Sequence, residues 1–335
     1  MAAVTLAEAS KNTQTDLDTS VIDEFRKESA ILDALIFDQA VNPAGGGATL
    51  TYGYRRQITQ RGAAFRAINS EYTTEAVTTE QKNVTLVPLG GAFEVDRVIA
   101  PLGKADSGAV ALNLRNTITA TTTKFQDAVI NGDVASDANG FDGLDKALVG
   151  SVTEFRAGQV TDWSDFDTNP RAEHKALDAI DEFLALLDGS PTLILGNARA
   201  LARVRAAARR AGQYTRNPIE GLLGPNGRPI TREMYGDVVF ADPGAKAGSN
   251  TPIIPTATRT VATVSTDNLT DLYAVRIGLD GFHAVSTVGG QLVQTWLPDF
   301  TTAGAVKKGE VEMGPVAVAL KATKAAAVFR NIKVA

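Results

Sequence analysis

The fold of this chain is decided by residues 106–133, which read DSGAVALNLRNTITATTTKFQDAVINGD. Apolar side chains recur in this stretch at helical spacing, with Thr121 interrupting the face, and this predicts a helix over residues 106–131. Asp106 is placed to cap the start of the helix and Asn131-Gly132 to end it. Threonine is a poor helix former, so tertiary contacts are expected to hold the middle of the helix. The predicted apolar face consists of Val110, Leu114, Ile118, Phe125 and Val129.

The helix runs directly into an acidic, glycine-rich segment, residues 131–145, which reads NGDVASDANGFDGLD. A calcium loop needs oxygen ligands at alternate positions and a glycine at the sixth position. A loop that starts at Asp137 puts Phe141 at a ligand position, and one that starts at Asp133 puts Ala135 there. We therefore interpret the segment as a connector whose Asn, Asp and Gly residues form turns, without a bound metal.

Two strand-like stretches precede the helix, at residues 49–59 and 84–98. About twenty residues with few apolar side chains separate them, whereas a tight hairpin needs only about two to five. A two-stranded ribbon of this kind cannot bury its own faces and is only marginally stable alone in water. We expect residues 49–99 to project as an extended ribbon that rests on another chain.

The first part of the chain is predicted to be an arm followed by a helix. Residues 1–18 are polar and small, and a helical stripe starts at Ser20 and continues through Ile22, Phe25, Ser29, Leu32 and Ile36. The N-terminus lacks a basic segment followed by an apolar run, so no secretory signal is expected. No window approaches about 18 uninterrupted apolar residues, so no membrane-spanning segment is expected either.

The central region, about 146–290, alternates between helix and strand. Helices are predicted after Asn169-Pro170 and at residues 198–210, on either side of a short buried strand, TLIL. We predict loops at residues 213–235 and 247–255. Further strands are expected at residues 238–241, 272–279, 282–288, 291–297, 316–323 and 325–334.

The residues that carry chemistry are few. The net charge of −5 argues against nucleic-acid binding driven by whole-protein charge, and the chain has no cysteine. Gly196 is followed by Ala198 and Leu201, so the three glycines of a dinucleotide-binding loop are not all present. The two histidines, His174 and His283, lie outside any hydrolase motif and are interpreted as a solvated residue and a strand residue with a satisfied ring. No catalytic site, cofactor or metal is predicted, and a soluble α/β enzyme is the alternative of another class.

Five arginines lie on the helix predicted at residues 198–210. We interpret them as a solvated face that pairs with local carboxylates; a phosphate-facing surface is the alternative. They are Arg199, Arg203, Arg205, Arg209 and Arg210.

In this order and spacing, the elements resemble the major capsid proteins of tailed double-stranded-DNA bacteriophages over nearly the whole chain. VIDEFRKESAILDAL looks like the family's helix before its extended loop, residues 49–99 look like that loop, and residues 106–133 look like its spine helix. The NGD that ends the helix, followed by FDGL, is similar to the hinge into the axial domain. LILGNARALARVR, with GQY and LLGPNGRPI downstream, resembles the axial helix and the loop after it.

The resemblance implies a mixed α+β fold with an N-terminal arm, an extended β-loop, a peripheral domain with a long spine helix and an axial α/β domain. The implied boundaries are the arm and first helix at 1–48, the extended loop at 49–99, the peripheral domain at 100–135 and 296–335, and the axial domain at 136–295.

The resemblance also implies a structural, non-enzymatic subunit that self-assembles into hexamers and pentamers of an icosahedral virion head enclosing double-stranded DNA. Its implied partners are other copies of the chain, a separate scaffolding protein, a portal, decoration proteins and non-specifically contacted DNA, with assembly in the cytoplasm of a bacterial host. An encapsulin nanocompartment shell, which has the same fold, is the alternative. Some family members cross-link through a lysine of the extended loop, but Lys82, the only lysine at 49–99, lies away from the arginine-rich part, so no cross-link is expected.

The extended loop carries the charged residues that we predict to act in assembly. Arginines precede glutamates along it, and in a repeated assembly such patches are complementary between neighbours. We expect at least two of the arginines to meet carboxylates of adjacent subunits, because planar guanidinium groups suit paired contacts with carboxylates. The predicted interface residues are Arg55, Arg56, Arg61, Arg66, Glu71, Glu75 and Glu80.

Overall fold

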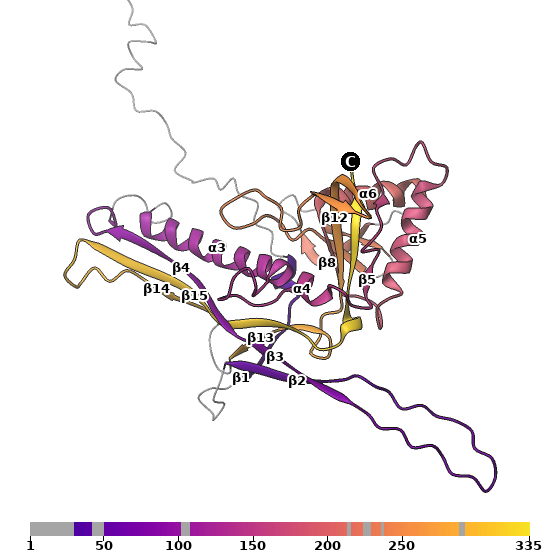
Figure 1. Ribbon diagram of the computed structural model, residues 1–335. Helices are drawn as coiled ribbons and strands as arrows, with labels where there is room; N and C mark the ends of the chain where they lie inside the picture. The colour runs from indigo at the N-terminus through magenta and orange to yellow at the C-terminus, as the bar shows by residue number, and fades with distance from the viewer. Residues whose placement is uncertain are drawn as a thin grey trace, which may run out of the picture.

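The computed structural model describes residues 30–41, 50–101, 108–212, 216–223, 229–235, 238–287 and 292–335. Side chains are described in these ranges except those of Ala30, Asp33 and residues 216–235. The predicted arm, the helical stripe up to Ser29 and the predicted cap Asp106 lie outside the described residues. Two sheets with their helices form the body, and a two-stranded ribbon projects from it (Figure 1).

The smaller sheet has five strands and is built around one long strand, β15 (Val306–Leu320). β15 pairs antiparallel with β4 (Val87–Asp96), β13 (Phe282–Thr287) and β14 (Val293–Trp296). β1 (Phe37–Val41) runs parallel beside β13. The ribbon prediction is therefore wrong for its last part, because β4 pairs along β15 and belongs to the body.

The long helix α3 (Ala109–Asn131) lies along β4 and β15 (Figure 1). It begins after Gly108 and buries its C-terminal half around Phe125. Thr121, predicted to interrupt the apolar face, is itself buried, because its hydroxyl donates to the carbonyl of Thr117 at 2.9 Å. A threonine that satisfies its hydroxyl within its own helix can face a core.

The connector after α3 is held by close approach of its backbone. The Gly143 N–H donates to the Gly132 carbonyl at 2.8 Å. A Cβ on Gly132 would lie 2.3 Å from the carbonyl oxygen of Phe141, so a side chain does not fit there. Both glycines have negative φ, so their role is close packing of two backbone segments and not the left-handed turn conformation.

The carboxylates of the connector bind backbone N–H groups. Asp133 accepts from the N–H of Ala135 at 3.0 Å and pairs with Lys146 at 3.2 Å, and these contacts lower the pKa of Asp133. Asp142 accepts from the N–H of Val134 at 2.9 Å. These contacts support the interpretation of residues 131–145 as a connector. It leads into α4 (Leu144–Leu148).

The larger sheet has nine strands, seven of them in the order β5-β16-β12-β7-β10-β9-β8. β11 pairs with β12, and β6 pairs with β16. The strands are β5 (Glu154–Phe155), β6 (Thr161–Asp162), β7 (Leu193–Gly196), β8 (Arg216–Leu223), β9 (Pro229–Tyr235), β10 (Val238–Ala241), β11 (Ala257–Val261), β12 (Val264–Val275) and β16 (Ala326–Lys333).

The two faces of the larger sheet are covered by different elements. Alternate residues of a strand point to opposite faces, so Ile194 packs under α5 (Ala172–Leu184) and α6 (Ala198–Arg210), while Leu193 and Leu195 face α4. A short 3₁₀ turn, η2 (Thr323–Ala325), leads into β16. The expected domain boundaries remain a prediction, although the sheets cut across them. β13 lies in the smaller sheet and β16 in the larger one.

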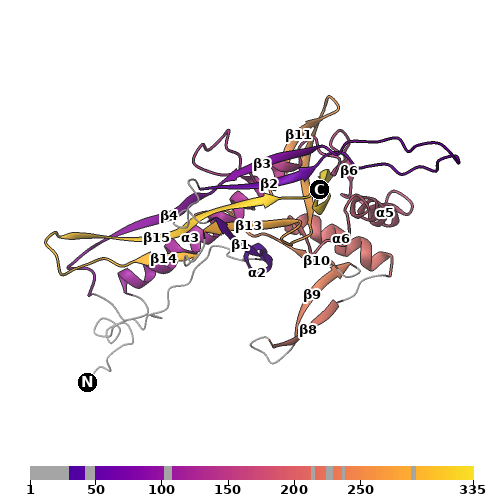
Figure 2. The same cartoon turned by 90° about the horizontal axis from the view of Figure 1, so that it is seen from below.

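Three predictions for local structure are wrong. Residues 213–235 were predicted to form a loop, but β8 and β9 form a hairpin there, which extends the larger sheet through the β9–β10 pair (Figure 2). The predicted surface loop at 247–255 buries Ile253 and Ile254 in the core. Ile36, predicted on a helical face, follows α2 (Ala30–Ala34) and is 45% exposed.

Candidate assembly interface

The ribbon consists of β2 (Thr51–Gln57) and β3 (Thr79–Thr85), paired antiparallel from Thr51↔Thr85 to Gln57↔Thr79. Every residue from 57 to 79 is exposed. This distal part extends away from both sheets (Figures 1 and 2). It buries little within its own chain, so its contribution to stability must come from contacts with something else.

The two arms of the distal part stay together through a few isolated hydrogen bonds. The Ile58 N–H donates to the Thr78 carbonyl at 2.9 Å, and the hydroxyls of Thr59 and Thr78 lie 2.9 Å apart. Glu75 accepts from the Gly62 N–H at 2.7 Å. The loop is thus a defined projection and keeps its two arms side by side beyond the ladder.

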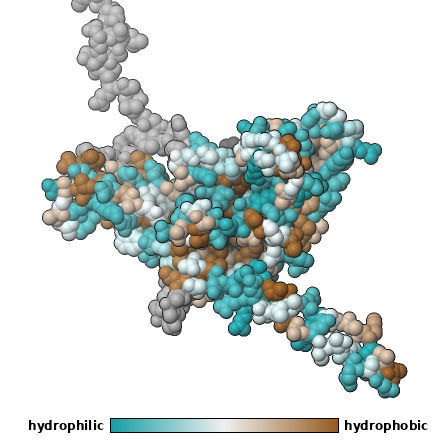
Figure 3. Space-filling view, viewed as in Figure 1, coloured by the Kyte–Doolittle hydropathy of each residue, from teal (hydrophilic) through white to brown (hydrophobic). Residues whose placement is uncertain are grey.

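The tip of the loop carries large apolar side chains that the sequence analysis missed. Phe65 is 108% exposed, Ile68 is 90% exposed and Tyr72 is 61% exposed. Figure 3 shows hydrophobic residues beside hydrophilic ones at the end of this projection. The signal was present in the sequence, but single apolar residues in a polar stretch show no period. Exposed apolar patches mark interaction sites, so this tip is a candidate for contact with a neighbour.

Arg56, predicted for the assembly interface, is anchored within the chain. Its guanidinium donates to the carbonyls of Leu320 at 2.8 Å and Lys321 at 3.0 Å. The Tyr54 hydroxyl donates to the same Leu320 carbonyl at 2.9 Å. Arg56 therefore fixes the root of the ribbon to the end of β15.

The other predicted arginines are more available. Arg55 and Arg61 are exposed and have no hydrogen bond or ion pair within the described residues. Arg66 donates to the carbonyls of Ala67 and Ser70, both at 3.2 Å, and lies 5.3 Å from the centre of the Tyr72 ring.

The predicted carboxylates differ in the same way. Glu71 has no partner among the residues that the structure describes. Glu75 accepts from the Gly62 N–H, and Glu80 pairs with Lys82 at 2.5 Å. The structure thus leaves Arg55, Arg61 and Glu71 with their charges unpaired within the described chain. The role of the seven residues in assembly stays a prediction.

The root of the ribbon surrounds a buried histidine. Tyr52 donates its hydroxyl to Asp38 at 3.1 Å and meets the His283 ring edge-on, with ring centres 5.9 Å apart. Within the described residues, neither nitrogen of His283 has a hydrogen-bond partner, so the expectation of a satisfied ring is wrong. The Asp38 carboxylate lies 3.9 Å from Nε2, and burial, aided by Lys321, lowers the pKa of His283. The ring is therefore neutral at pH 7.

A charged network joins α4 to the larger sheet. Arg330 on β16 contacts three carboxylates: Asp145, Glu154 at 2.9 Å and Asp271 at 3.3 Å. Asp271 is 3% exposed and is paired a second time, with Arg259 at 2.7 Å. The carboxylates around Arg330 raise its pKa above the usual range, so the guanidinium stays charged at neutral and alkaline pH. The network is a structural tie, because it joins α4 to β12 and β16 through side chains that are largely buried.

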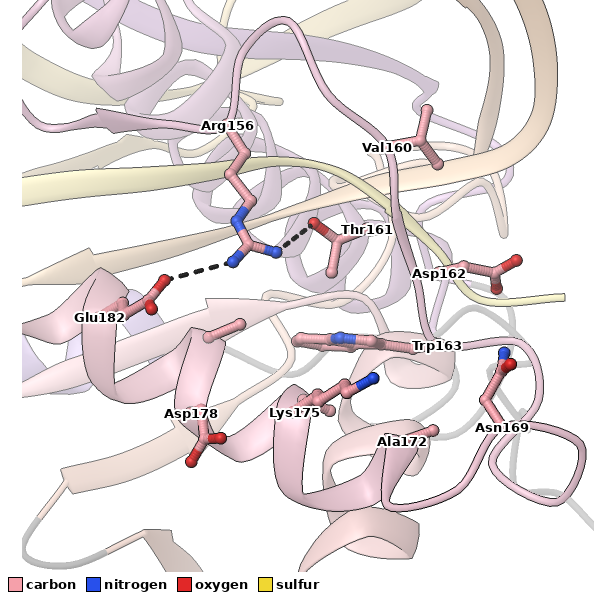
Figure 4. Close-up of a pocket in the computed structure, with 12 residues that line it drawn as sticks. Arg156, Val160, Thr161, Asp162, Trp163, Asn169, Ala172, Lys175, Asp178 and Glu182 are labelled. Atoms are coloured by element: carbon pink, nitrogen blue, oxygen red, sulfur yellow. Dashed lines mark hydrogen bonds and ion pairs between the residues drawn. The ribbon is translucent and has the colours of Figure 1, made fainter.

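A surface pocket of about 530 Å³ lies between α5 and the loop that holds Arg156 and Trp163 (Figure 4). Arg156 spans it, donating to Thr161 at 3.1 Å and to Glu182 at 3.2 Å. Trp163 is 1% exposed and packs beneath the loop. The described lining holds mixed charges and no histidine, and two of its carboxylates, Asp162 and Glu182, are paired with Lys333 and Arg156.

Within the described residues, no group of three or more His, Cys, Asp or Glu side chains is arranged to hold a metal ion. Of the helices in the described ranges, none has the length and apolar character needed to cross a membrane.

Comparison with known proteins finds similar folds among solved structures. No family model matches the chain, and no curated protein matches its sequence. The chain is similar in structure to an encapsulin from Synechococcus elongatus PCC 7942, in its holo-SrpI complex, with 15% identity over 99% of this chain and 97% of that one and a TM-score of 0.62. It is also similar to the capsid of the native GTA particle, with 12% identity over 98% of this chain and 99% of that one and a TM-score of 0.57. A chain of Mycobacterium phage Bobi is similar with 15% identity over 99% of this chain and 98% of that one and a TM-score of 0.56.

The similarity extends over nearly the full length of each chain. The predicted mixed α+β fold of tailed-phage major capsid proteins and encapsulins is thereby confirmed. At these identities the likeness establishes the fold, and function must be argued from the molecule itself.

Proposed function

We propose that this protein is the structural subunit of an icosahedral bacteriophage head, self-assembling into hexamers and pentamers that enclose double-stranded DNA. The observation that carries the proposal is the projecting loop. Residues 57–79 are exposed throughout and end in Phe65, Ile68 and Tyr72. An isolated chain gains nothing from this surface, whereas a shell of copies buries it at every repeat.

The proposed assembly is geometric. The ribbon is fixed at its root by Arg56 and Tyr54, so its tip reaches a defined place outside the body. There the tip covers a neighbouring copy, and Arg55 and Arg61 meet carboxylates of that neighbour. A single exposed ion pair contributes only about 0–1 kcal/mol. Many repeated contacts act together at high effective concentration and stabilise the shell.

The finer assignments rest on the same fold. The subunit acts without catalysis, in the virion, after assembly in the cytoplasm of a bacterial host. A separate scaffolding protein, a portal, decoration proteins and non-specifically contacted DNA are its further partners. No covalent cross-link through Lys82 is needed, because Lys82 is paired with Glu80 away from the tip.

An encapsulin-type compartment is the second candidate, favoured by the likeness to the encapsulin of Synechococcus elongatus. The content of purified particles separates the two. Nucleic acid inside supports the phage head, and a protein cargo without nucleic acid supports the compartment.

The test is sedimentation of the purified wild type beside a tip variant, Phe65→Ser with Ile68→Ser. We expect the wild type to form capsomers and particles and the tip variant to remain small, while circular dichroism shows both to be folded. A matched control, Val149→Ser with Val152→Ser, removes exposed apolar side chains of the body, which are 62% and 74% exposed. Assembly lost equally in the tip variant and the control would argue against a role of the loop.

A further inference from the structure

Two segments that contain the helices packed on the larger sheet carry opposite net charges. Residues 156–188, which include α5, contain eight Asp or Glu residues and three Lys or Arg. Residues 189–212, which include α6, contain five arginines and no acidic residue. The two segments therefore carry equal and opposite net charge, although α5 and α6 pack side by side on one face of the same sheet.

The charged side chains point away from the sheet. α6 turns most of its apolar side chains inward and leaves Arg199 and Arg209 exposed. Ala202 is exposed between these arginines, where its small side chain permits a neighbour to come close. The buried residues of α5 are Ala176, Leu177, Ala179, Ile180 and Phe183.

The outward face of α5 is the acidic counterpart. Asp178 and Glu182, one turn apart, are both exposed on it. Figure 4 shows Asp178 pointing away from Arg156 and Glu182 reaching toward it. Glu182 keeps 61% of its side chain exposed in that pair.

The chain neutralises part of this charge internally, since Glu182 pairs with Arg156 at 3.2 Å and Asp162 with Lys333 at 3.6 Å. Arg210 pairs with Asp167 at 2.6 Å, and Arg203 donates to the carbonyl of Val334 at 3.0 Å. Arg199 has no partner within the described residues. Arg209 donates to a carbonyl of its own helix, at 3.4 Å, and meets no carboxylate in the described part of the chain. The outward arginines of α6 are thus available to an external acidic group.

We propose that the outward face of α6 in one copy docks against the outward face of α5 in the next copy around a capsomer. The inference rests on the proposed function, since it needs a ring of identical subunits. In a head-to-tail ring each copy presents two different surfaces, which must complement each other. An acidic surface and a basic surface of equal net charge meet that condition, and opposite charges also set the register between partners.

A second copy fits these observations better than a nucleic acid does. A phosphate backbone laid on α6 would also run beside the carboxylates of α5 and be repelled by them. The whole chain is acidic as well, with a net charge of −5. A neighbouring copy offers the basic face an acidic face of the same length.

The test uses charge reversal on each face separately and together. The basic-face variant is Arg199→Glu with Arg209→Glu, and the acidic-face variant is Asp178→Arg with Glu182→Arg. Each alone makes both surfaces of a subunit alike in sign, so we expect loss of the capsomer peak in sedimentation velocity. The four-substitution variant, which has the wild-type net charge, should regain capsomers. An equimolar mixture of the two double variants should form six-membered rings, in which the two kinds alternate, but no five-membered rings.

The outcomes separate the charge contact from the proposed function. A wild type that never associates would overturn both. Normal capsomers from the basic-face variant would overturn only the contact between α5 and α6, and particles of that variant that lack nucleic acid would assign α6 to nucleic acid instead. Circular dichroism checks the fold of every variant. If one double variant does not fold, failure of the four-substitution variant to restore assembly overturns the proposal.

Discussion

Replacing Arg330 with methionine tests how the larger sheet is tied to the connector. Arg330 contacts Asp145, Glu154 and Asp271, and its side chain is only 11% exposed. Methionine keeps most of the volume and removes the charge, which leaves the three carboxylates close together without their common partner.

The magnitude follows from the burial of each carboxylate. Breaking a buried pair by removing one partner costs about 3–5 kcal/mol, because the other charge stays buried. Asp145 is 40% exposed and can turn to water, and Asp271 keeps its contact with Arg259 at 2.7 Å. We therefore expect the free energy of unfolding to fall by about 3 kcal/mol, the lower end of that range. With an unfolding entropy of about 2.1 cal/mol/K per residue, a chain of 335 residues then loses roughly 4 °C in Tm.

The assay is urea unfolding of dissociated subunits, followed by tryptophan fluorescence and circular dichroism. Arg210→Met is the control, because it removes an arginine from an exposed pair with Asp167, whose side chain is 80% exposed. We expect this control to unfold with the wild type. Coincident unfolding of the Arg330→Met variant and the control would refute the reasoning that burial of the network makes it stabilising.

Three further predictions concern single positions. Burial lowers the pKa of His283, so the unfolded chain takes up a proton before the folded chain does as the pH falls. The free energy of unfolding should therefore decrease below about pH 6.5, and it should decrease less steeply in the His283→Leu variant. Equal slopes in the wild type and the variant would count against a buried neutral ring. Gly132→Ala should cost about 1–3 kcal/mol in chemical unfolding, since its Cβ would meet the Phe141 carbonyl at 2.3 Å, whereas Gly158→Ala, with nothing within 4 Å, should be silent. Burial and nearby carboxylates raise the pKa of Tyr273, so the free energy of unfolding should fall as the pH rises above about 10, and Tyr273→Phe should flatten that slope; an unchanged slope would show that the folded tyrosine ionises normally.

The sequence predicted the elements whose residues carry a period or a boundary signal. The helix at 109–131, the strand at 193–196 and the helix at 198–210 were found because apolar spacing and glycine or asparagine boundaries agree there. The order of these elements was enough to indicate the fold. Such agreement between levels is what local reasoning can detect.

The missed features depend on contacts between distant segments. Nothing local shows that Ile253 and Ile254 insert into the core, because a loop has no period that reports burial. Arg56 reads like the other arginines of the loop, but its partners are carbonyls about 265 residues away along the chain. The sequence shows that the segment of α5 is acidic and the segment of α6 is basic. Only the structure shows that these two helices lie side by side on the larger sheet.

Electron microscopy of the purified protein shows directly whether the chain forms a shell. We expect rings of five and six subunits and closed icosahedral shells built from them, because the exposed loop and the two charged helical faces each need a neighbouring copy. A uniform population of folded monomers at every protein and salt concentration would contradict it.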